Sequence, residues 1–461
     1  MIKSVLFFQI LTLLLPQVFS DNMVLQQGRD VPVWGTAAAK ESVTVTLTDE
    51  GGAVVAKAKT KADKEGAWMI QLPSMKAEGK TYTLAVDTRK ESVKFSNVAV
   101  GEVWLCSGQS NMAYEMRRSW QRAPLKGEDL CTAELQKPAN PMIRVFIPGR
   151  PMRPGAPAPA VKNGWKVADG TSLAPVSAVG YFFAKNISEQ LGVPVGIISS
   201  ASGGSEIEQW LPGGSLYGFG IKALMPYAIG GFLWYQGESN LAHKTTDYLE
   251  KYVALTEDWR SGFNSPDAPF YSVLLAPHTY SDRLHRGSFV TSEALPLFWQ
   301  IQMNAAKAVK NSEIICITDL IDTPEDIHPS YKWIVGQRLA KLALKEHFAA
   351  EGATEWCGPR ASSLRIDGDK AIVSFEHCAE GLKGRSNSVE PNSTPRLKWF
   401  EVAGADGIWH QALAEICGKN EVAVSHPEVA KPVSVRFAWR ETAQPNLFNS
   451  EDLPAFPFVI K

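Results

Sequence analysis

Residues 101–116 read GEVWLCSGQSNMAYEM. This stretch decides the fold, because an apolar run that suits a strand is followed there by a serine at the expected start of a helix. The segment EVWLCSG is predicted to close a strand, and a helix is expected to begin near Ser110. In that position the serine hydroxyl would lie above the edge of a sheet, next to backbone N–H groups that can bind an oxyanion. A serine at a helix start is also an ordinary N-cap, so this stretch alone leaves both interpretations open.

Strand and helix patterns alternate on both sides of this stretch, from about residue 101 to residue 349. Apolar runs that suit buried parallel strands read VPVGIISS (193–200), GGFLWYQG (230–237), FYSVLLAP (270–277) and SEIICITDL (312–320). A helical stripe between residues 179 and 191 ends at Gly192, and a last helix is expected over residues 329–348. This alternation predicts a doubly wound α/β domain with a parallel sheet.

Short alternating strands flank this central region. Residues 16–97 contain VTVTLT and TYTLAV, with a hairpin turn expected at residues 49–52, which is typical of a β-sandwich. After residue 352 the sequence predicts hairpins around Asp367-Gly368 and Asp406-Gly407 and a late strand, PVSVRFAW. The expected domains are therefore an N-terminal β-domain (16–98), a catalytic domain (99–349) and a C-terminal β-domain (350–461).

The N-terminus carries the features of an export signal. Lys3 precedes an apolar run from Ser4 to Leu15, so residues 1–20 are predicted to be a signal peptide with an uncertain boundary. The protein is then expected in the periplasm or outside the cell, and no other segment is apolar enough to span a membrane. The net charge of -1 gives no indication of a nucleic-acid partner, and the oligomeric state is left undetermined.

The six cysteines give no sign of a metal site, because none forms a C-x-x-C pair. Export would permit disulfides, but the spacing specifies none. Cys106 and Cys316 lie in strand-like apolar runs and are predicted to be core residues. Cys357, Cys378 and Cys417 could include a disulfide pair.

Polar residues follow the first three predicted strands, where doubly wound folds gather reactive groups. Ser110 follows the first strand. In SSASGGSEIEQW (199–210), Gly203 and Gly204 allow a backbone N–H to approach a ligand closely. In LWYQGESN (233–240) an amide, a carboxylate and a hydroxyl crowd one strand end. Each segment also reads as an ordinary turn or surface loop, so their combination is the stronger indication.

A histidine follows the last of these predicted strands, in TDLIDTPEDIHPSYKW (318–333). His328 precedes Pro329, a residue that suits the first helical position, so His328 is expected at a helix N-terminus. The helix dipole disfavours an imidazolium there, and a carboxylate from Glu325 or Asp326 would help to stabilise it. The order of serine first and histidine last differs from that of the α/β-hydrolases, and no G-x-S-x-G elbow surrounds the serine.

These segments resemble a known family. GEVWLCSGQSNM, SGGSEIEQWLPGG, LWYQGESN and DIHP are similar to the sialate O-acetylesterases, a branch of the SGNH hydrolases. The resemblance covers nearly the whole chain, including LPQVFSDNMVLQQGRDVPVWG near the N-terminus and NLFNSEDLPAFPF near the C-terminus. It implies an α/β fold: a flavodoxin-like SGNH-hydrolase three-layer domain with additional N-terminal and C-terminal β-sandwich-like domains.

The resemblance also implies catalytic roles. Ser110 matches the nucleophile and His328 the general base. The family usually places an aspartate three residues before the histidine, where this chain has Glu325. Glu325 is therefore the expected acid, with Asp326 and a backbone carbonyl as the alternatives.

The oxyanion hole is expected from three strand ends. The backbone N–H groups of Ser110 and of Gly204, or else Gly203, match two of the family's donors. The third donor falls in YQGES, where we prefer the neutral amide of Gln236 because the carboxylate of Glu238 would repel an oxyanion.

Four further residues are expected to bind substrate or to support the site. Glu238 is expected to hold neighbouring loops by hydrogen bonds, and Glu208 and Trp210 match a recurring E-x-W close to the site. The remaining residue, Asn111, follows the nucleophile directly.

The resemblance therefore implies a hydrolase, a serine esterase that removes O-acetyl groups from sugars, foremost sialic acid, through an acetyl-serine intermediate. It requires no metal and no cofactor. The alternatives are an acetyl xylan or other polysaccharide acetylesterase with the same machinery and, from another class, a catalytically inactive secreted carbohydrate-binding protein. In each case the expected partner is a carbohydrate.

Overall fold

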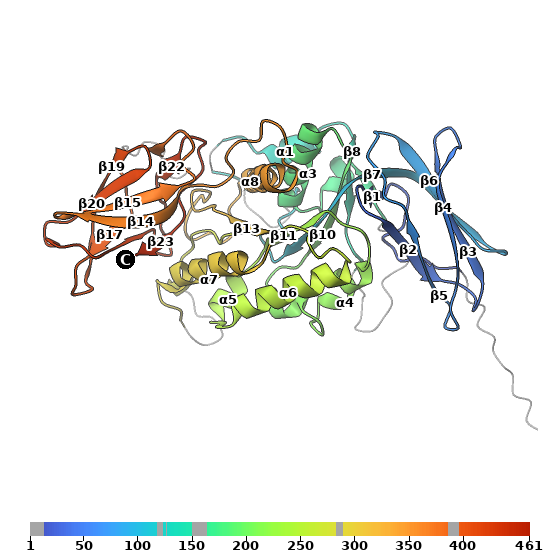
Figure 1. The fold of residues 1–461 in the computed structure, drawn as a ribbon, viewed down its shortest axis with the longest axis horizontal. Coiled ribbons are helices and arrows are strands. Elements are labelled where there is room, and N and C mark those ends of the chain that lie inside the picture. The colour runs from blue at the N-terminus through green and yellow to red at the C-terminus, as the bar shows by residue number, and fades with distance from the viewer. Residues whose placement is uncertain (1–12, 118–122, 126, 150–163, 283–288, 386–395) are drawn as a thin grey trace, which may run out of the picture.

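A computed structural model describes residues 13–117, 123–125, 127–149, 164–282, 289–385 and 396–461. Three regions follow one another along the long axis of the molecule (Figure 1). A β-domain lies at the N-terminal end, an α/β domain occupies the middle, and a second β-domain lies at the C-terminal end. The predicted α/β domain with a β-domain on each side is therefore confirmed.

One long strand joins the first two regions. Strand β7 (Ser92–Gly108) pairs through its first part with β6 (Thr81–Asp87) of the N-terminal domain. Its second part pairs with strands of the central sheet. Side chains alternate between exposed and half-buried over residues 92–97, and every residue from Val98 to Gly108 is buried. The predicted domain boundary at 98/99 thus lies inside a continuous strand, at the point where its burial pattern changes.

The central sheet runs in the order β13-β12-β11-β7-β10-β8-β9, and all neighbours are parallel except the last pair. Taken in chain order, β7, β10, β11, β12 and β13 have the flavodoxin-like order 2-1-3-4-5, whose ligand site lies where the order reverses, beside β7. The strands not yet bounded are β8 (Asn140–Phe146), β9 (Lys166–Ala168), β10 (Val195–Ala201), β11 (Gly231–Tyr235), β12 (Phe270–Val273) and β13 (Ser312–Ile315).

Helices cover both faces of this sheet (Figure 1). On one side α3 packs against α8, and on the other α6 packs against α7. The predicted helix over residues 179–191 is α3, which ends at Gly192 in the left-handed conformation. The α-helices are α1 (Leu130–Leu135), α2 (Gly170–Leu173), α3 (Ala178–Leu191), α4 (Tyr217–Gly220), α5 (Glu238–Ala242), α6 (Tyr248–Gly262), α7 (Ala294–Ala308) and α8 (Lys332–Leu342). Short helical turns are η1 (Ile207–Trp210), η2 (Lys222–Leu224), η3 (Tyr280–Asp282) and η4 (Ala343–His347).

Two helix starts differ from the sequence prediction. No helix begins at Ser110, because residues 114–117 pair instead with the segment before α3: Ala178 N–H donates to Tyr114 O at 2.8 Å and Met116 N–H to Val176 O at 3.1 Å. The last helix begins at Lys332 rather than at Pro329. Long-range pairing outweighs local helix propensity at the first of these sites.

The N-terminal domain contains β1 (Val24–Gln26), β2 (Val31–Thr36), β3 (Ser42–Asp49), β4 (Val54–Lys61), β5 (Ala67–Leu72) and β6. Residues 1–12 of the predicted signal peptide lie outside the described residues, but residues 13–20 belong to the folded domain. Leu14 pairs with Thr36, and the Trp165 indole N–H donates to Val18 O at 2.9 Å. A leader ending at Ser20 would remove these contacts.

The C-terminal domain has its own hydrophobic core, whereas the first two regions share one. Its strands form the sheets β14-β15-β20-β19, β18-β17-β21-β23 and β16-β22. They are β14 (Arg360–Asp367), β15 (Lys370–Glu376), β16 (Leu382–Gly384), β17 (Phe400–Ala403), β18 (Trp409–Gln411), β19 (Leu413–Gly418), β20 (Glu421–Ser425), β21 (Ser434–Phe437), β22 (Leu447–Asn449) and β23 (Phe458–Ile460). The hairpins expected around residues 367–368 and 406–407 connect β14 to β15 and β17 to β18.

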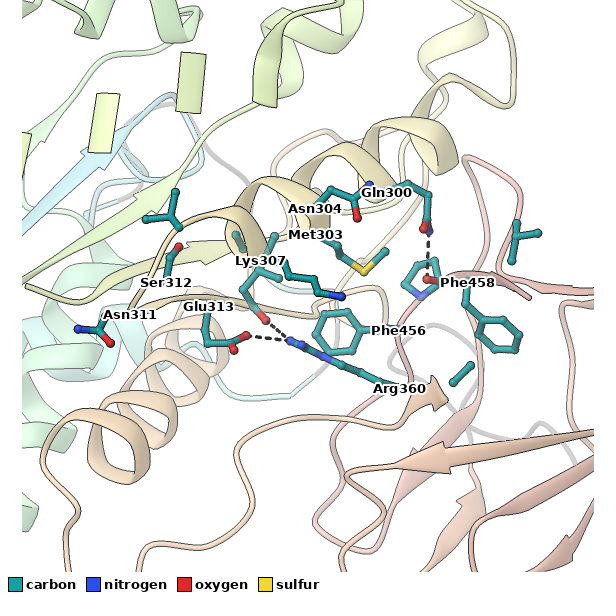
Figure 2. A pocket seen from close by; sticks show the side chains of 16 residues that line it. Gln300, Met303, Asn304, Lys307, Asn311, Ser312, Glu313, Arg360, Phe456 and Phe458 are labelled. Carbon is teal, nitrogen blue, oxygen red and sulfur yellow. Dashed lines mark hydrogen bonds and ion pairs between the residues drawn. The ribbon is translucent and has the colours of Figure 1, made fainter. Parts of the chain in front are cut away.

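Polar contacts fasten this domain to the α/β domain around a cavity of about 660 Å³ (Figure 2). Arg360 donates to Glu313 at 3.1 Å, and its guanidinium lies 4.6 Å from the centre of the Phe456 ring. Gln300 on α7 donates to the Pro457 carbonyl at 3.3 Å. These side chains bind the two domains to each other across the cavity wall.

All six cysteines are free, so the disulfide considered for the C-terminal cysteines does not form. Five are buried and only Cys417 is exposed. Burial raises the pKa of Cys316 and of Cys378 to about 11, which keeps these thiols protonated at neutral pH.

We therefore expect Ellman's reagent to label one thiol in the native protein and all six after denaturation in guanidinium. The Cys417→Ser variant should show almost no rapid labelling while native, because only the buried thiols remain. Rapid labelling of two or more thiols in the native wild-type protein would contradict this burial pattern.

Candidate active site

The ends of β7, β10 and β11 are tied together just before the candidate site. Gly108, the last residue of β7, has φ +136°, and a Cβ there would come 2.2 Å from the Tyr235 carbonyl oxygen. Gln109 N–H donates to this same carbonyl at 3.0 Å, and Ser202 N–H donates to Gly108 O at 3.0 Å. Only glycine fits this crossing, which brings Ser110 to the switch point of the sheet.

Ser110 and His328 form a hydrogen bond, although 218 residues separate them in the chain. His328 Nε2 lies 2.8 Å from Ser110 Oγ, and both residues are half-buried. A nucleophile and base need this contact, since Nε2 must accept the hydroxyl proton. The structure thus brings together the two residues that the sequence predicted as nucleophile and base.

The two acidic candidates behind His328 are placed differently. Asp326 Oδ1 accepts the His328 backbone N–H at 2.9 Å and lies 4.0 Å from Nδ1 of the ring. Glu325 is exposed, and a hydrogen bond from the Thr323 side chain is the main cause that lowers its pKa. The geometry therefore favours Asp326 over the predicted Glu325, acting through its charge and through the backbone that it holds.

Backbone N–H groups are available beside the nucleophile. Gly203 lies against Ser110, since a Cβ on Gly203 would come 3.8 Å from the Ser110 Cβ. Gly204 follows in the left-handed conformation with φ +69°. Within the described part of the chain, no acceptor pairs with the backbone N–H of Ser110, Gly203 or Gly204. These groups can bind an oxyanion without a helix at Ser110.

The side-chain amide of Gln236, the predicted third donor, donates its hydrogen bonds to other groups of the protein. Its side chain is fully buried, and Nε2 donates to Asn240 Oδ1 at 2.6 Å, to Ser205 O at 3.0 Å and to Gln109 Oε1 at 3.1 Å. Its Oε1 accepts the Tyr248 hydroxyl at 3.1 Å. An amide has two N–H groups, so this residue keeps none for a ligand and instead braces the strand ends.

Sequence reasoning missed Gln109, although it directly precedes the serine. Its side-chain oxygen also accepts the backbone N–H groups of Gly237 and Ser239, at 3.4 and 3.3 Å. The oxygen is therefore surrounded by donors, and the amide orientation is set by them.

Glu208 and Trp210 support the site from η1. Glu208 accepts Lys251 Nζ at 2.6 Å and Asn240 Nδ2 at 3.0 Å. Partial burial raises its pKa, but these two hydrogen bonds outweigh that effect and leave the pKa lowered. Trp210 is 1% exposed, and its indole N–H donates to Ser205 Oγ at 3.0 Å. Trp210 thus holds the loop after β10 through Ser205, and its supporting role at the site stays a prediction.

Asn111 and Glu238 form a buried pair, and a lysine that sequence reasoning missed completes it. Asn111 Nδ2 donates to Glu238 Oε1 at 2.6 Å, while Lys332 Nζ donates to Asn111 Oδ1 at 2.8 Å. The sequence did contain a signal that this lysine is buried, because residue 332 lies on the same helical stripe as the buried Val335 and Leu339. A lysine on an apolar stripe needs a buried partner.

Two other features lie away from this site. The cavity in Figure 2 is lined by residues of α7, of the segment that leads into and forms β13, and of the C-terminal domain. Neither Ser110 nor His328 lines it. Among the described residues, His410, His426 and Glu428 are grouped so that one ligand atom of each lies within 4.8 Å of the others, as a metal ion would need. They belong to the C-terminal domain, so the Ser110 chemistry does not depend on them.

The arrangement around Ser110 fits acyl transfer through a serine nucleophile. His328 can accept the hydroxyl proton as an oxygen–carbon bond forms, and N–H groups from two strand ends can bind the oxyanion. Every group needed for this step comes from the chain itself.

Known proteins match both the sequence and the fold. The profile of the family described as "carbohydrate esterase, sialic acid-specific acetylesterase" matches residues 100–345. The human and Pongo abelii proteins named sialate O-acetylesterase are each 27% identical, over 95% of this chain and 91% of theirs. The crystal structure of a carbohydrate acetylesterase from Xanthomonas citri is 30% identical, with a TM-score of 0.83 over 98% of this chain and all of that one. Among the described residues, no helix is long and apolar enough to cross a membrane.

We expect the Asp326→Asn variant to react more slowly than wild type with a fluorophosphonate that labels Ser110. A unit charge at 4 Å contributes about 1 kcal/mol in a water-like medium and about 4 kcal/mol at an effective dielectric of about 20. For this half-exposed pair a five- to fiftyfold slower labelling rate is expected.

The matched control is Glu325→Gln, three residues before the histidine instead of two. Its labelling rate should stay within about twofold of wild type, because that carboxylate is exposed to solvent. A large loss in Glu325→Gln with no loss in Asp326→Asn would restore the original prediction.

Proposed function

We propose, given that this chain belongs to the family of sialic acid-specific carbohydrate acetylesterases, that it is a serine esterase that removes O-acetyl groups from sialic acid. The observation that carries this proposal is the 2.8 Å hydrogen bond between Ser110 Oγ and His328 Nε2 at the switch point of the sheet. The backbone N–H groups of Ser110 and Gly203 lie beside it, and no acceptor among the described residues pairs with them.

In the proposed reaction, His328 takes the proton of Ser110 while Oγ attacks the acetyl carbonyl carbon. The negative charge that develops on the carbonyl oxygen is held by the backbone N–H groups of Ser110 and of Gly203 or Gly204. Collapse of the tetrahedral intermediate breaks the ester bond, and His328 gives its proton to the leaving sugar hydroxyl. A water molecule, deprotonated by His328, then attacks the acetyl-serine and releases acetate.

A second candidate is an acetylesterase that acts on xylan or on another polysaccharide with the same machinery. The Xanthomonas citri protein, 30% identical over 98% of this chain, is described as a carbohydrate acetylesterase, a name that specifies no sugar and so fits this candidate as well as the sialic acid one. The polysaccharide and sialic acid hypotheses share every chemical step and differ only in the sugar.

A third candidate is a secreted carbohydrate-binding protein without catalysis, and the intact contact between Ser110 and His328 argues against it. We also retain export to the periplasm or the medium as a proposal, with the end of the leader left open because residues 13–20 pack in the folded domain.

The proposal is tested by measuring acetate release from O-acetylated sialic acid and from acetylated xylan in parallel. Wild-type protein should release acetate from the sialic acid faster, and Ser110→Ala should lower the rate at least about a thousandfold, because the nucleophile is lost. The matched control Ser261→Ala, on the exposed surface of α6, should keep the wild-type rate.

The outcomes separate the candidates. Preference for xylan would move the assignment to the polysaccharide esterases. Full activity in Ser110→Ala would exclude the serine mechanism. If wild-type Ser110 took no fluorophosphonate and released no acetate from either substrate, the binding protein would be the better assignment.

A further inference from the structure

Lys332 is a fully buried lysine beside the nucleophile. It is 0% exposed and is the first residue of α8. Its Nζ donates to Asn111 Oδ1 at 2.8 Å and to the Pro329 carbonyl at 2.5 Å. The ammonium also lies 4.8 Å from the centre of the Tyr114 ring and 5.5 Å from that of Tyr235. An ammonium enclosed in this way has no water to replace these partners.

A buried carboxylate balances this charge through Asn111. Glu238 is 3% exposed, and its Oε1 accepts Asn111 Nδ2 at 2.6 Å. Burial raises the pKa of Glu238, while the hydrogen bond from Asn111 and the charge of Lys332 act in the opposite direction. The amide of Asn111 thus lies between the two charges, accepting from one and donating to the other.

Both sides of His328 are held by this trio. Asn111 Nδ2 donates to the carbonyl of Ile327 at 3.0 Å, and Lys332 Nζ donates to the carbonyl of Pro329. These are the residues immediately before and after His328 in the chain. Asn111 in turn directly follows Ser110, so one amide side chain connects the backbone beside the nucleophile to the backbone beside the base.

Stability is a poor reason for such an arrangement. Removing two charges from water is costly, and buried ion pairs can often be replaced by apolar side chains without loss of stability. Geometry is the better reason, because a displacement of about 1 Å between reacting groups can lower a rate about a hundredfold.

We propose that Lys332, anchored by Asn111 and Glu238, is a positioning residue that sets the distance between Ser110 Oγ and His328 Nε2. This inference rests on the proposed serine mechanism and deepens it. Because Lys332 is fully buried and donates hydrogen bonds to Asn111 and to the Pro329 carbonyl, its loss should act on the chemical step and leave substrate binding unchanged.

The test compares three variants: Lys332→Met, Glu238→Gln and the double variant that carries both. Lys332→Met leaves a buried carboxylate without its cation, so its melting temperature should fall. The double variant removes both charges together, and its melting temperature should return toward wild type. The matched control is Lys341→Met, on the same helix, whose half-exposed ammonium pairs with Glu451 at 3.2 Å.

A positioning role predicts that the double variant recovers its melting temperature but not its rate. In the double variant kcat for acetate release should stay about 10- to 100-fold below wild type, with KM within about twofold, although the melting temperature has recovered. Fluorophosphonate labelling of Ser110 should slow by a similar factor. Lys341→Met should match wild type in all of these measurements.

A double variant with a wild-type melting temperature and wild-type labelling rate would overturn the proposal and leave the trio a purely structural feature. If Lys332→Met and the double variant failed to fold, Glu238→Gln would decide. This isosteric change weakens the hold on Asn111, and about three- to tenfold slower labelling with a native melting curve is expected; an unchanged rate would overturn the proposal.

Because fluorophosphonate labelling needs no sugar, a failure of the positioning proposal can be told apart from a failure of the proposed function. A wild-type protein that is labelled at Ser110 but releases no acetate from acetylated sugars would refute the assigned substrate. The comparison of labelling rates among the variants would remain valid in that case.

Discussion

The structure depends on strand β7, which belongs to two sheets at once. Its first residues complete the N-terminal β-sheet, and its last residues form the middle of the parallel sheet. A strand in the middle of a parallel sheet must be apolar on both faces, which accounts for the uninterrupted burial from Val98 to Gly108. The hydrophobic core is likewise continuous across the two domains. Ser110 lies two residues beyond the end of this strand, so the strand fixes its position.

The site itself is built by amides more than by charges. The side chains of Gln109, Gln236 and Asn240 connect the loops after β7 and β11, where Gln236 Nε2 donates to the side-chain oxygens of both Gln109 and Asn240. Asn111 extends the same principle toward His328. Such a framework keeps the backbone N–H groups next to Ser110 in place before any substrate arrives, and this is what electrostatic stabilisation of an oxyanion requires.

Much of this could be predicted from the sequence, because strand ends in a doubly wound fold are marked by apolar runs. The runs before Ser110, Gly203, Gln236 and His328 were long enough to place all four residues at one edge of one sheet. What could not be predicted was the direction of each side chain. Gln236 looked like an oxyanion donor because it is neutral, yet its two N–H groups face buried acceptors. Glu325 looked like the acid because of its spacing, yet the chain turns so that Asp326 faces the ring.

The shared strand also has a consequence for the order in which the protein takes shape during synthesis. The N-terminal sheet can close as soon as residue 101 has left the ribosome, since its partners all precede that point. The second half of β7 then waits, with both edges and both apolar faces uncovered, until residues 195–201 and 231–235 have been made. The second half of β7 therefore lacks its partner strands until residue 235 has been made, and an unpaired apolar strand of this kind is prone to aggregation.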